Sequence, residues 1–306
     1  MNVSSDGAIN DKGKSMRVLV IGGNGKVGRP LVGRLLASGA AVRVLTRSAE
    51  RAPMIDPRAQ PVVADLADDP ASAVAAFAGI DAVYMLNQPT FRETAEGLLA
   101  IEIARSAGVR RFVYQSVFRV EDLAYLPHVA PKWTIQRALM QSGMRWTVLS
   151  PNHFYQNDLM TRAALLERGQ YTLPVGPIGC SSVDAEDIAA AATVVLTGEG
   201  HERRNYAIVG PRPLSGQDCA QAWSQALGRD VQYAGDFERW REQMKPAMPA
   251  WLNFDLALMY RDFGSRGFLA SEREVAQMHE LLGRPARSYE DYVRMQAAEW
   301  TAAQPA

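Results

Sequence analysis

The chain has 306 residues with 33 basic and 33 acidic side chains, so its formal net charge at pH 7 is zero. This balance argues against the strongly basic surface with which proteins hold nucleic acid or anionic membranes, and we expect neither as a partner. No apolar run approaches the ~20 residues that cross a bilayer, because the stretch 188–196 is far too short. The length permits one large domain or two interlocked ones.

The cysteines and the first residues indicate a compartment. Cys180 and Cys219 have the spacing of neither a metal site nor a redox motif, and no secretory signal is evident. We therefore expect two free thiols in a reducing compartment, the cytoplasm, and no bound metal. Residues 1–15 are polar and lack an apolar segment, which predicts a disordered tail, and Met16 is an alternative start.

Residues 17–34 read as an apolar strand, a glycine-rich turn and a helix in direct succession. The glycines at 22, 23, 25 and 28 satisfy both G-x-x-G-x-x-G and G-x-G-x-x-G. In such a motif one glycine permits the tight turn, one lets backbone amides approach a pyrophosphate, and one lets the helix pack on the sheet. The anion then sits at the helix N-terminus, where unpaired N–H groups and the dipole favour it.

This turn is the predicted phosphate site, and its alternative is a structural turn that binds no nucleotide. Apolar residues recur at helical spacing after the turn, and Pro30 stands where a first helical turn tolerates proline. This context favours the nucleotide interpretation. The candidate contacts are Gly22, Asn24, Gly25, Lys26, Val27 and Gly28.

Further strands and amphipathic helices alternate along the chain. The helices are predicted to end at glycines, as in 38–40 and 107–109, where left-handed C-caps are expected. Strands separated by such helices predict a Rossmann-type doubly wound parallel sheet over residues 16–150. The predicted strands are 18–21, 41–45, 60–64, 80–86, 111–115 and 145–149, and the predicted helices after the first are 69–77, 94–107 and 130–142.

Beyond residue 150 the alternation breaks, and residues 151–306 are predicted to form a smaller α/β cap with elements that return to the first domain. The segment 237–268 is rich in aromatic residues and methionine. It fits either an apolar substrate lid or ordinary core. The predicted elements in this half are helices at 182–197, 215–227 and 289–300 and a strand at 206–209.

The residue that ends the second strand of such a sheet faces the adenosine ribose. Here the strand ends in VLTRS, with Arg47 about twenty residues past the glycine turn and Glu50 as the nearest acid. Since a guanidinium suits a 2'-phosphate bidentately, we predict NADP(H) rather than NAD as the cofactor. The alternative is a solvated loop arginine.

Ligands of open α/β sheets bind at the carboxyl ends of the strands, which gives further candidates. Asp65 and Leu66 follow the third strand and are predicted to meet the adenine, while Asn87 and Gln88 follow the fourth and would border the ribose or nicotinamide. A turn role is the alternative at each. The residues after the sixth strand, expected at the nicotinamide end, are Pro151, Asn152, His153, Phe154 and Tyr155.

Taken together, these motifs resemble the short-chain dehydrogenase/reductase superfamily and, within it, the atypical NmrA-like group. The resemblance covers nearly the whole chain after the tail. It is carried by GGNGKVG (22–28), TR (46–47), ADL (64–66), FVYQS (112–116), the helix segment 128–151, NHFYQN (152–157), VDAEDIA (183–189) and YEDYVR (289–294).

The resemblance implies a Ser, Tyr and Lys catalytic set, with Tyr four residues before Lys as the proton donor. Ser116 matches the serine and Lys132 the lysine, but His128 stands at the tyrosine position. Lys132 is expected to hold the nicotinamide ribose hydroxyls and to favour negative charge on substrate, or else to be a solvated helix residue. A neutral His128 is a candidate donor to a carbonyl, with helix capping as its alternative. Tyr155 is a second candidate proton donor.

The expected activity is hydride transfer from NADPH to a small apolar electrophile such as a quinone, enone, aldehyde or imine. The alternative is a non-catalytic NADP(H) sensor that regulates a protein partner, a role that the resemblance also allows. A homodimer is a further candidate assembly. The sequence leaves the substrate, the direction of reaction and the oligomeric state open.

Overall fold

The computed structural model describes residue 8 and residues 13–302. The predicted disorder of the remaining N-terminal residues therefore lies outside the described part. Two described positions of this segment are hydrogen-bonded: the Ala8 N–H donates to the carbonyl of Ser38 at 2.6 Å, and Ser15 Oγ donates to that of Gly39 at 2.6 Å.

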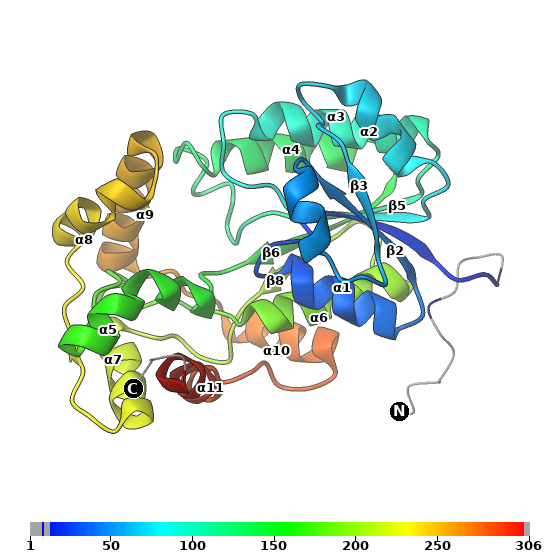
Figure 1. Cartoon of the computed structure of the whole chain (residues 1–306). Coiled ribbons are helices and arrows are strands. Elements are labelled where there is room, and N and C mark those ends of the chain that lie inside the picture. The colour runs from blue at the N-terminus through cyan, green and yellow to red at the C-terminus, as the bar shows by residue number, and fades with distance from the viewer. Residues whose placement is uncertain (1–7, 9–12, 303–306) are drawn as a thin grey trace. The chain divides into compact units, whose positions relative to one another are not determined.

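A seven-stranded sheet has the order β3-β2-β1-β4-β5-β6-β8 (Figure 1). Five neighbouring pairs in it run parallel, which confirms the predicted doubly wound parallel sheet. The strand order reverses between β1 and β4, the place where such sheets bind ligands. The strands are β1 (Arg17–Ile21), β2 (Ala41–Thr46), β3 (Gln60–Val63), β4 (Ala82–Met85), β5 (Arg111–Gln115), β6 (Arg145–Pro151) and β8 (Arg204–Ile208).

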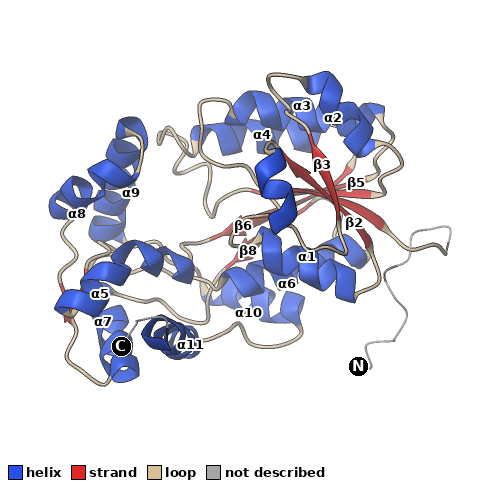
Figure 2. Ribbon diagram, in the orientation of Figure 1, coloured by secondary structure: helices blue, strands red, loops and turns tan. Residues whose placement is uncertain are grey.

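Helices cover both faces of this sheet, whose strands are red in Figure 2. In Figure 1, α1 (Gly28–Ala37) and α6 (Ala185–Thr197) lie on one face, and α2 (Pro70–Phe77), α3 (Glu93–Ser106) and α4 (Ala130–Gln141) lie on the other. Strands β4 and β5 are buried along their whole length, as expected where both faces are covered. Short 3₁₀ turns, η1 (Ala49–Met54) among them, complete the connections.

The predicted glycine caps are confirmed. Gly39, Gly79, Gly108 and Gly143 each have a positive φ, between 68° and 81°. Each lies just beyond a helix of this region, where the left-handed conformation satisfies the last carbonyl groups. These four glycines mark the helix ends correctly because the signal is local.

The chain divides into two compact units. Unit 1 comprises residues 1–125, 129–150 and 188–206, and unit 2 comprises 126–128, 151–187 and 207–306. The further elements, all in unit 2, are η2 (Tyr155–Thr161), α5 (Arg162–Arg168), β7 (Gln170–Tyr171), α7 (Gly216–Leu227), β9 (Gln232–Tyr233), α8 (Phe237–Met244), η3 (Lys245–Ala247), α9 (Ala250–Arg266), α10 (Glu272–Leu282) and α11 (Tyr289–Ala302).

Unit 2 contains a two-stranded sheet, β7 with β9, and is otherwise mostly helical. Its aromatic side chains form much of its interior. Phe263 stacks on Phe268 at 4.6 Å between ring centroids, and Trp240 meets Tyr260 edge-on at 4.9 Å. All four are buried, so this part of the segment 237–268 is core. By contrast, Phe254 in the same segment is 56% exposed.

Candidate cofactor site

The glycine turn after β1 leaves a helix N-terminus without a side-chain cap. The Gly25 N–H donates to the carbonyl of Gly22 at 3.1 Å, and α1 then begins at Gly28 with Val27 as its N-cap. Val27 makes no capping hydrogen bond. Within the first turn of α1, Arg29 donates its N–H to the carbonyl of Gly25 at 3.1 Å, Leu31 donates to that of Val27, and Pro30 has no N–H. The Gly28 N–H is therefore the group of this turn that is left for an anion.

The four glycines of the turn are there for different reasons. A Cβ atom at Gly22, Gly23 or Gly28 would lie within 2.2–2.6 Å of protein atoms, and Gly22 also has a φ of +90°. At Gly25 the nearest atom, the carbonyl oxygen of Gly22, would be 3.4 Å from the added Cβ. The protein's own packing thus requires glycine at the other three positions but not at Gly25, where the space lies open for a ligand.

Arg47, just after β2, belongs to a charged cluster in unit 1. Its Nη1 lies 3.2 Å from Oε1 of Glu96, and Arg92 Nε lies 3.4 Å from the same oxygen. Arg92 also pairs with Asp65 and Asp68. Because 42% of the Arg47 side chain is exposed, its guanidinium is oriented by Glu96 while remaining accessible to a phosphate.

Two other strand-end predictions fall on residues with local roles. Oδ1 of Asp65 accepts the N–H groups of Ala67 and Asp68 at 2.9 and 2.8 Å. Burial acts to raise the pKa of Asp65, but these N–H groups and Arg92 together hold that pKa below its usual range. Asp65 thus closes its own turn. Leu66 is buried beside it.

Polar atoms without partners mark the ends of β4 and β5. Asn87 and Ser116 are 7% and 3% exposed, and neither Asn87 Oδ1 nor Ser116 Oγ has a hydrogen-bond partner among the described residues. Asn24 Oδ1 in the glycine turn is likewise buried without a hydrogen-bond partner among these residues, whereas Gln88 is exposed. Buried polar atoms are almost always satisfied, so a ligand with hydroxyl or amide groups fits this edge. The residues present therefore suit a dinucleotide.

A close helix contact places Lys132 opposite a buried carboxylate. A Cβ on Gly97 of α3 would lie 2.4 Å from Ile135 of α4, so the absent side chain allows the two helices to approach. One turn earlier on α3, Glu93 is fully buried and accepts a hydrogen bond from Lys132 Nζ. Burial, with the nearby Glu93 charge, also raises the pKa of Tyr114. The ammonium has three donors, so the Glu93 bond leaves it further hydrogen-bonding capacity.

His128 lies just before α4, as the sequence predicts, but its side chain has a partner that the sequence did not indicate. His128 Nδ1 is 2.5 Å from Oδ2 of Asp255 on α9, and the His128 backbone N–H donates to the same oxygen at 2.9 Å. Both residues belong to unit 2.

The residues that follow β6 make their polar contacts inside unit 2. Asn152 Nδ2 donates to the carbonyl of Phe268 at 3.0 Å. The two ring nitrogens of His153 lie 3.3 Å from Ser182 Oγ and 3.2 Å from Tyr260 Oη. Pro151 is buried and Phe154 half-buried. None of these contacts tests the predicted place of this segment at the nicotinamide.

Tyr155 is enclosed within unit 2. It is 2% exposed, its hydroxyl donates to the carbonyl of Arg287 at 3.2 Å, and its ring packs against Tyr289 and Tyr292. Burial first, and the charges of Asp184 and Asp187 next, raise the pKa of Tyr155 far above its usual value. These are the surroundings of a packing residue, and the role of Tyr155 as a second proton donor stays a prediction.

The sequence analysis did not single out three acidic partners of the predicted site residues: Glu93, Glu96 and Asp255. The first two open α3 at the spacing that puts both on the first helical turn, where acidic residues are common for reasons of the dipole alone. From the local sequence alone, an acid that only complements the helix dipole cannot be told from one that also pairs with a cation far along the chain. Asp255 is an acid inside a mostly apolar helix, which is a signal of a buried partner that could have been used.

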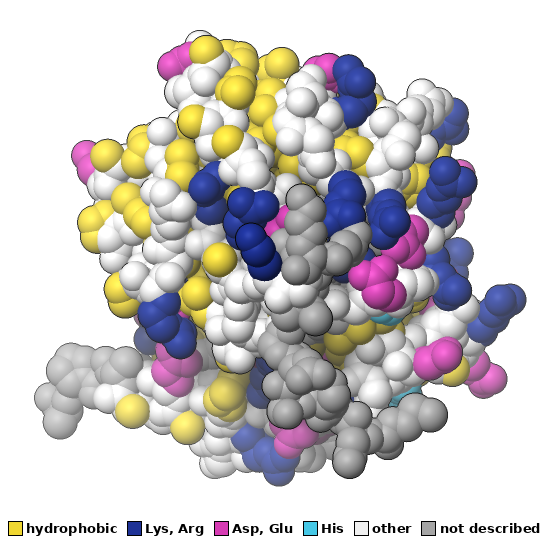
Figure 3. Space-filling view, turned by 90° about the vertical axis from the view of Figure 1, so that its right-hand side faces the viewer, with side chains coloured by type: hydrophobic (Ala, Val, Ile, Leu, Met, Phe, Trp, Pro, Cys, Tyr) yellow, Lys and Arg dark blue, Asp and Glu magenta, His cyan; other side chains and the backbone are white. Residues whose placement is uncertain are grey.

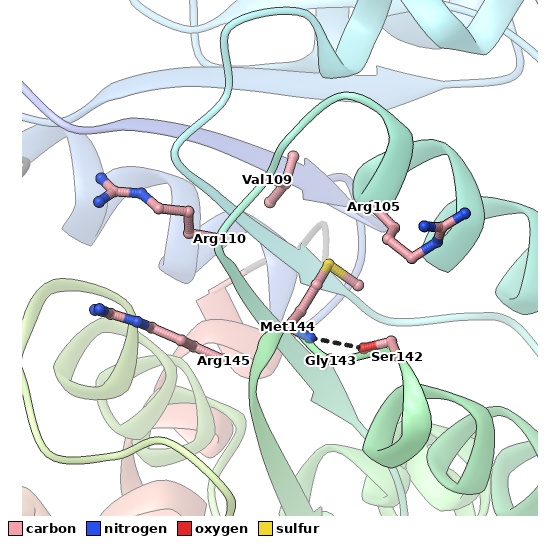
Figure 4. A pocket seen from close by; sticks show the side chains of 7 residues that line it. All are labelled: Arg105, Val109, Arg110, Ser142, Gly143, Met144 and Arg145. Carbon is pink, nitrogen blue, oxygen red and sulfur yellow. Dashed lines mark hydrogen bonds between the residues drawn. The ribbon is translucent and has the colours of Figure 1, made fainter.

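A shallow pocket of about 380 Å³ lies elsewhere in unit 1. Figure 4 shows Arg110 and Arg145 on one side of it and Arg105 on the other, with Met144 between them. Arg110 and Arg145 stand at the amino ends of β5 and β6. This pocket therefore lies at the edge opposite the carboxyl ends and is separate from the candidate cofactor site.

Two features are absent from the residues that the structure describes. No helix there is long and apolar enough to span a membrane, and no group of three His, Cys, Asp or Glu side chains could hold a metal ion. Cys180 and Cys219 are buried free cysteines. On the face shown in Figure 3, basic and acidic side chains both occur, in keeping with the balanced charge.

Comparison with known proteins identifies the family and the fold of the chain. Residues 14–293 match the NmrA-like family. The NAD(P)H azoreductase of Xenophilus azovorans is 31% identical over 290 residues, which cover 94% of this chain and 100% of the relative.

Two solved structures share the fold over nearly the whole chain. The NADPH-dependent quinone oxidoreductase QOR2 of Escherichia coli in complex with NADPH has a TM-score of 0.81 and 21% identity, covering 91% of this chain and 99% of that one. NmrA, a negative transcriptional regulator in complex with NADP, has a TM-score of 0.80 and 21% identity, covering 95% and 98%.

Proposed function

We propose, from the premise that this chain belongs to the NmrA-like family, that it is an NADPH-dependent reductase of a small apolar electrophile. Its relatives include NAD(P)H-dependent reductases, one of them named an azoreductase. A quinone, enone, aldehyde, imine or azo compound is the substrate class that we assign. The polar atoms of Asn87 and Ser116, buried without partners among the described residues, are the observation that carries the cofactor part of the proposal.

Each candidate residue at the carboxyl ends of the unit 1 strands has a role in this function. The glycine turn and the Gly28 N–H at the start of α1 bind the pyrophosphate, and Arg47 binds the 2'-phosphate. Asn87 and Ser116 bind polar groups farther along the cofactor. Lys132, oriented by Glu93, donates to ribose hydroxyls and stabilises negative charge that develops on the substrate. Bound NADPH would supply the hydride, and His128 the proton, in place of the usual tyrosine.

Turnover is the direct test. Purified protein should consume NADPH with at least one member of a panel that contains a naphthoquinone, an azo dye, an enone, an aromatic aldehyde and a cyclic imine. The change in NADPH absorbance measures the rate. Tight NADP(H) binding with no turnover across this panel would contradict the enzyme. A protein partner that binds differently to the NADP- and NADPH-loaded forms would then support a sensor.

Cofactor preference is expected to depend on Arg47. Arg47→Ala should weaken NADP binding by about 10- to 100-fold, a loss expected for a charge-assisted bidentate contact, and should change NAD binding little. Titration calorimetry with both nucleotides measures this. Arg58→Ala is the matched control, because Arg58 is an exposed arginine that pairs with Asp56 in a turn. Equal weakening of NADP and NAD would show that Arg47 does not meet the 2'-phosphate.

A further inference from the structure

The His128–Asp255 pair in unit 2 has the geometry of an oriented imidazole. Asp255 is 1% exposed, and its Oδ2 accepts two bonds from His128, from the backbone N–H at 2.9 Å and at Nδ1 at 2.5 Å. Two bonds from one residue to one oxygen fix both the position of the backbone and the plane of the ring. The His128 side chain is 12% exposed, so the ring is enclosed without being sealed from solvent.

The environment of Asp255 makes His128 its principal partner. Among the described residues, Asp255 forms an ion pair with His128 and with no other residue, and its Oδ1 has no hydrogen-bond partner. A buried carboxylate is costly unless it is paired. Among the described residues His128 bonds through its backbone N–H and Nδ1, and Nε2 has no hydrogen-bond partner. Nε2 is therefore the ring nitrogen that can bond to a substrate.

We propose that Asp255 is a positioning residue that keeps a proton on Nδ1 of His128 and so reserves Nε2 for proton transfer to the substrate. A carboxylate accepts hydrogen bonds and cannot donate, so it selects the ring form with hydrogen on Nδ1. This inference rests on the proposed function for its catalytic part. The arrangement of the dyad itself stands on the distances.

For a substrate X=Y, the proton comes from His128 and the hydride from the nicotinamide. One atom gains a hydride, with its two electrons, from the nicotinamide, and the other gains the proton from His128 Nε2, to give HX–YH and oxidised cofactor. The ring is left neutral with its remaining proton on Nδ1, bonded to Asp255. A proton from water then restores Nε2–H.

The ring tautomer is measurable without turnover. In ¹⁵N–¹H correlation spectra of the full-length protein, the neutral ring of His128 should carry its proton on Nδ1. His128→Gln identifies the signal among the four histidines. Asp255→Asn offers an amide that can donate to Nδ1, so the proton should move toward Nε2. A wild-type ring protonated on Nε2 overturns the inference at once, whether or not any Asp255 variant folds.

Kinetics test whether Asp255 acts through His128. Asp255→Asn should lower kcat by about 10- to 100-fold, a fraction of a full general-acid contribution, with KM for NADPH unchanged. In a His128→Gln background, the same change should have no further effect on kcat. Asp262→Asn is the matched control, because Asp262 lies on the same helix and pairs with Arg266 at 3.1 Å.

The outcomes separate the two proposals. Equal losses of kcat from Asp255→Asn with and without His128 would overturn the positioning role while leaving the reductase intact. Absence of turnover in the wild type would contradict the proposed function, and the tautomer spectra would still decide the dyad.

Discussion

Gly28→Ala should destabilise the protein severely, while Gly25→Ala three residues earlier should leave its stability nearly unchanged. A Cβ at position 28 would lie 2.2 Å from the carbonyl oxygen of Gly22 and 2.6 Å from Cα of Gly23. Both are backbone atoms, so no side chain can rotate away. We expect a cost of about 3 kcal/mol or more, and hence a fall in Tm of about 10 °C for a domain of this size.

Gly25→Ala is the functional counterpart of the same experiment. The nearest atom, at 3.4 Å, is ordinary van der Waals contact, so thermal unfolding should shift by no more than a degree or two. The added methyl group enters the space assigned to the pyrophosphate, and NADPH affinity should fall by about 100-fold or more. If Gly25→Ala binds NADPH normally, the phosphates do not approach this turn.

The second large effect concerns Lys132 and Glu93. Lys132→Met removes the cation that faces a fully buried carboxylate, and we expect a loss of about 3–5 kcal/mol in the free energy of unfolding. It should also lower kcat by about 100-fold or more, since the ammonium no longer stabilises charge on the substrate. Denaturant unfolding and NADPH consumption measure the two quantities separately.

The double variant Lys132→Met with Glu93→Gln separates stability from catalysis. With both charges gone, the free energy of unfolding should recover most of the loss, because no charge remains in the interior at this place. The turnover should stay as low as in Lys132→Met. If the double variant regains activity, Lys132 has only a structural role. If it is as unstable as the sum of the single variants, the two side chains do not interact.

The elements that the sequence predicted well are those with a local signal. Strands such as β5 and β2 were placed to within a residue, because short apolar runs between glycine-capped helices have few other interpretations. Helix α10 was missed although Ser271 and Glu274 form a capping box at its start. The helix is clearly amphipathic, so its capping box and its apolar face were local signals that could have been used.

The features of the candidate site also fall into those with a local sequence signal and those without one. The sequence by itself determined the parallel sheet and the glycine turn, and it predicted the edge at which a ligand would bind, since each depends on neighbouring residues. Only the tertiary structure decided which acid faces each functional cation or imidazole. Lys132 meets Glu93, Arg47 meets Glu96 and His128 meets Asp255 across 39, 49 and 127 residues of chain. Local sequence patterns do not show which distant residues will pair. The pairing of Lys132 with Glu93, for example, depends on how α3 and α4 pack at Gly97 and Ile135.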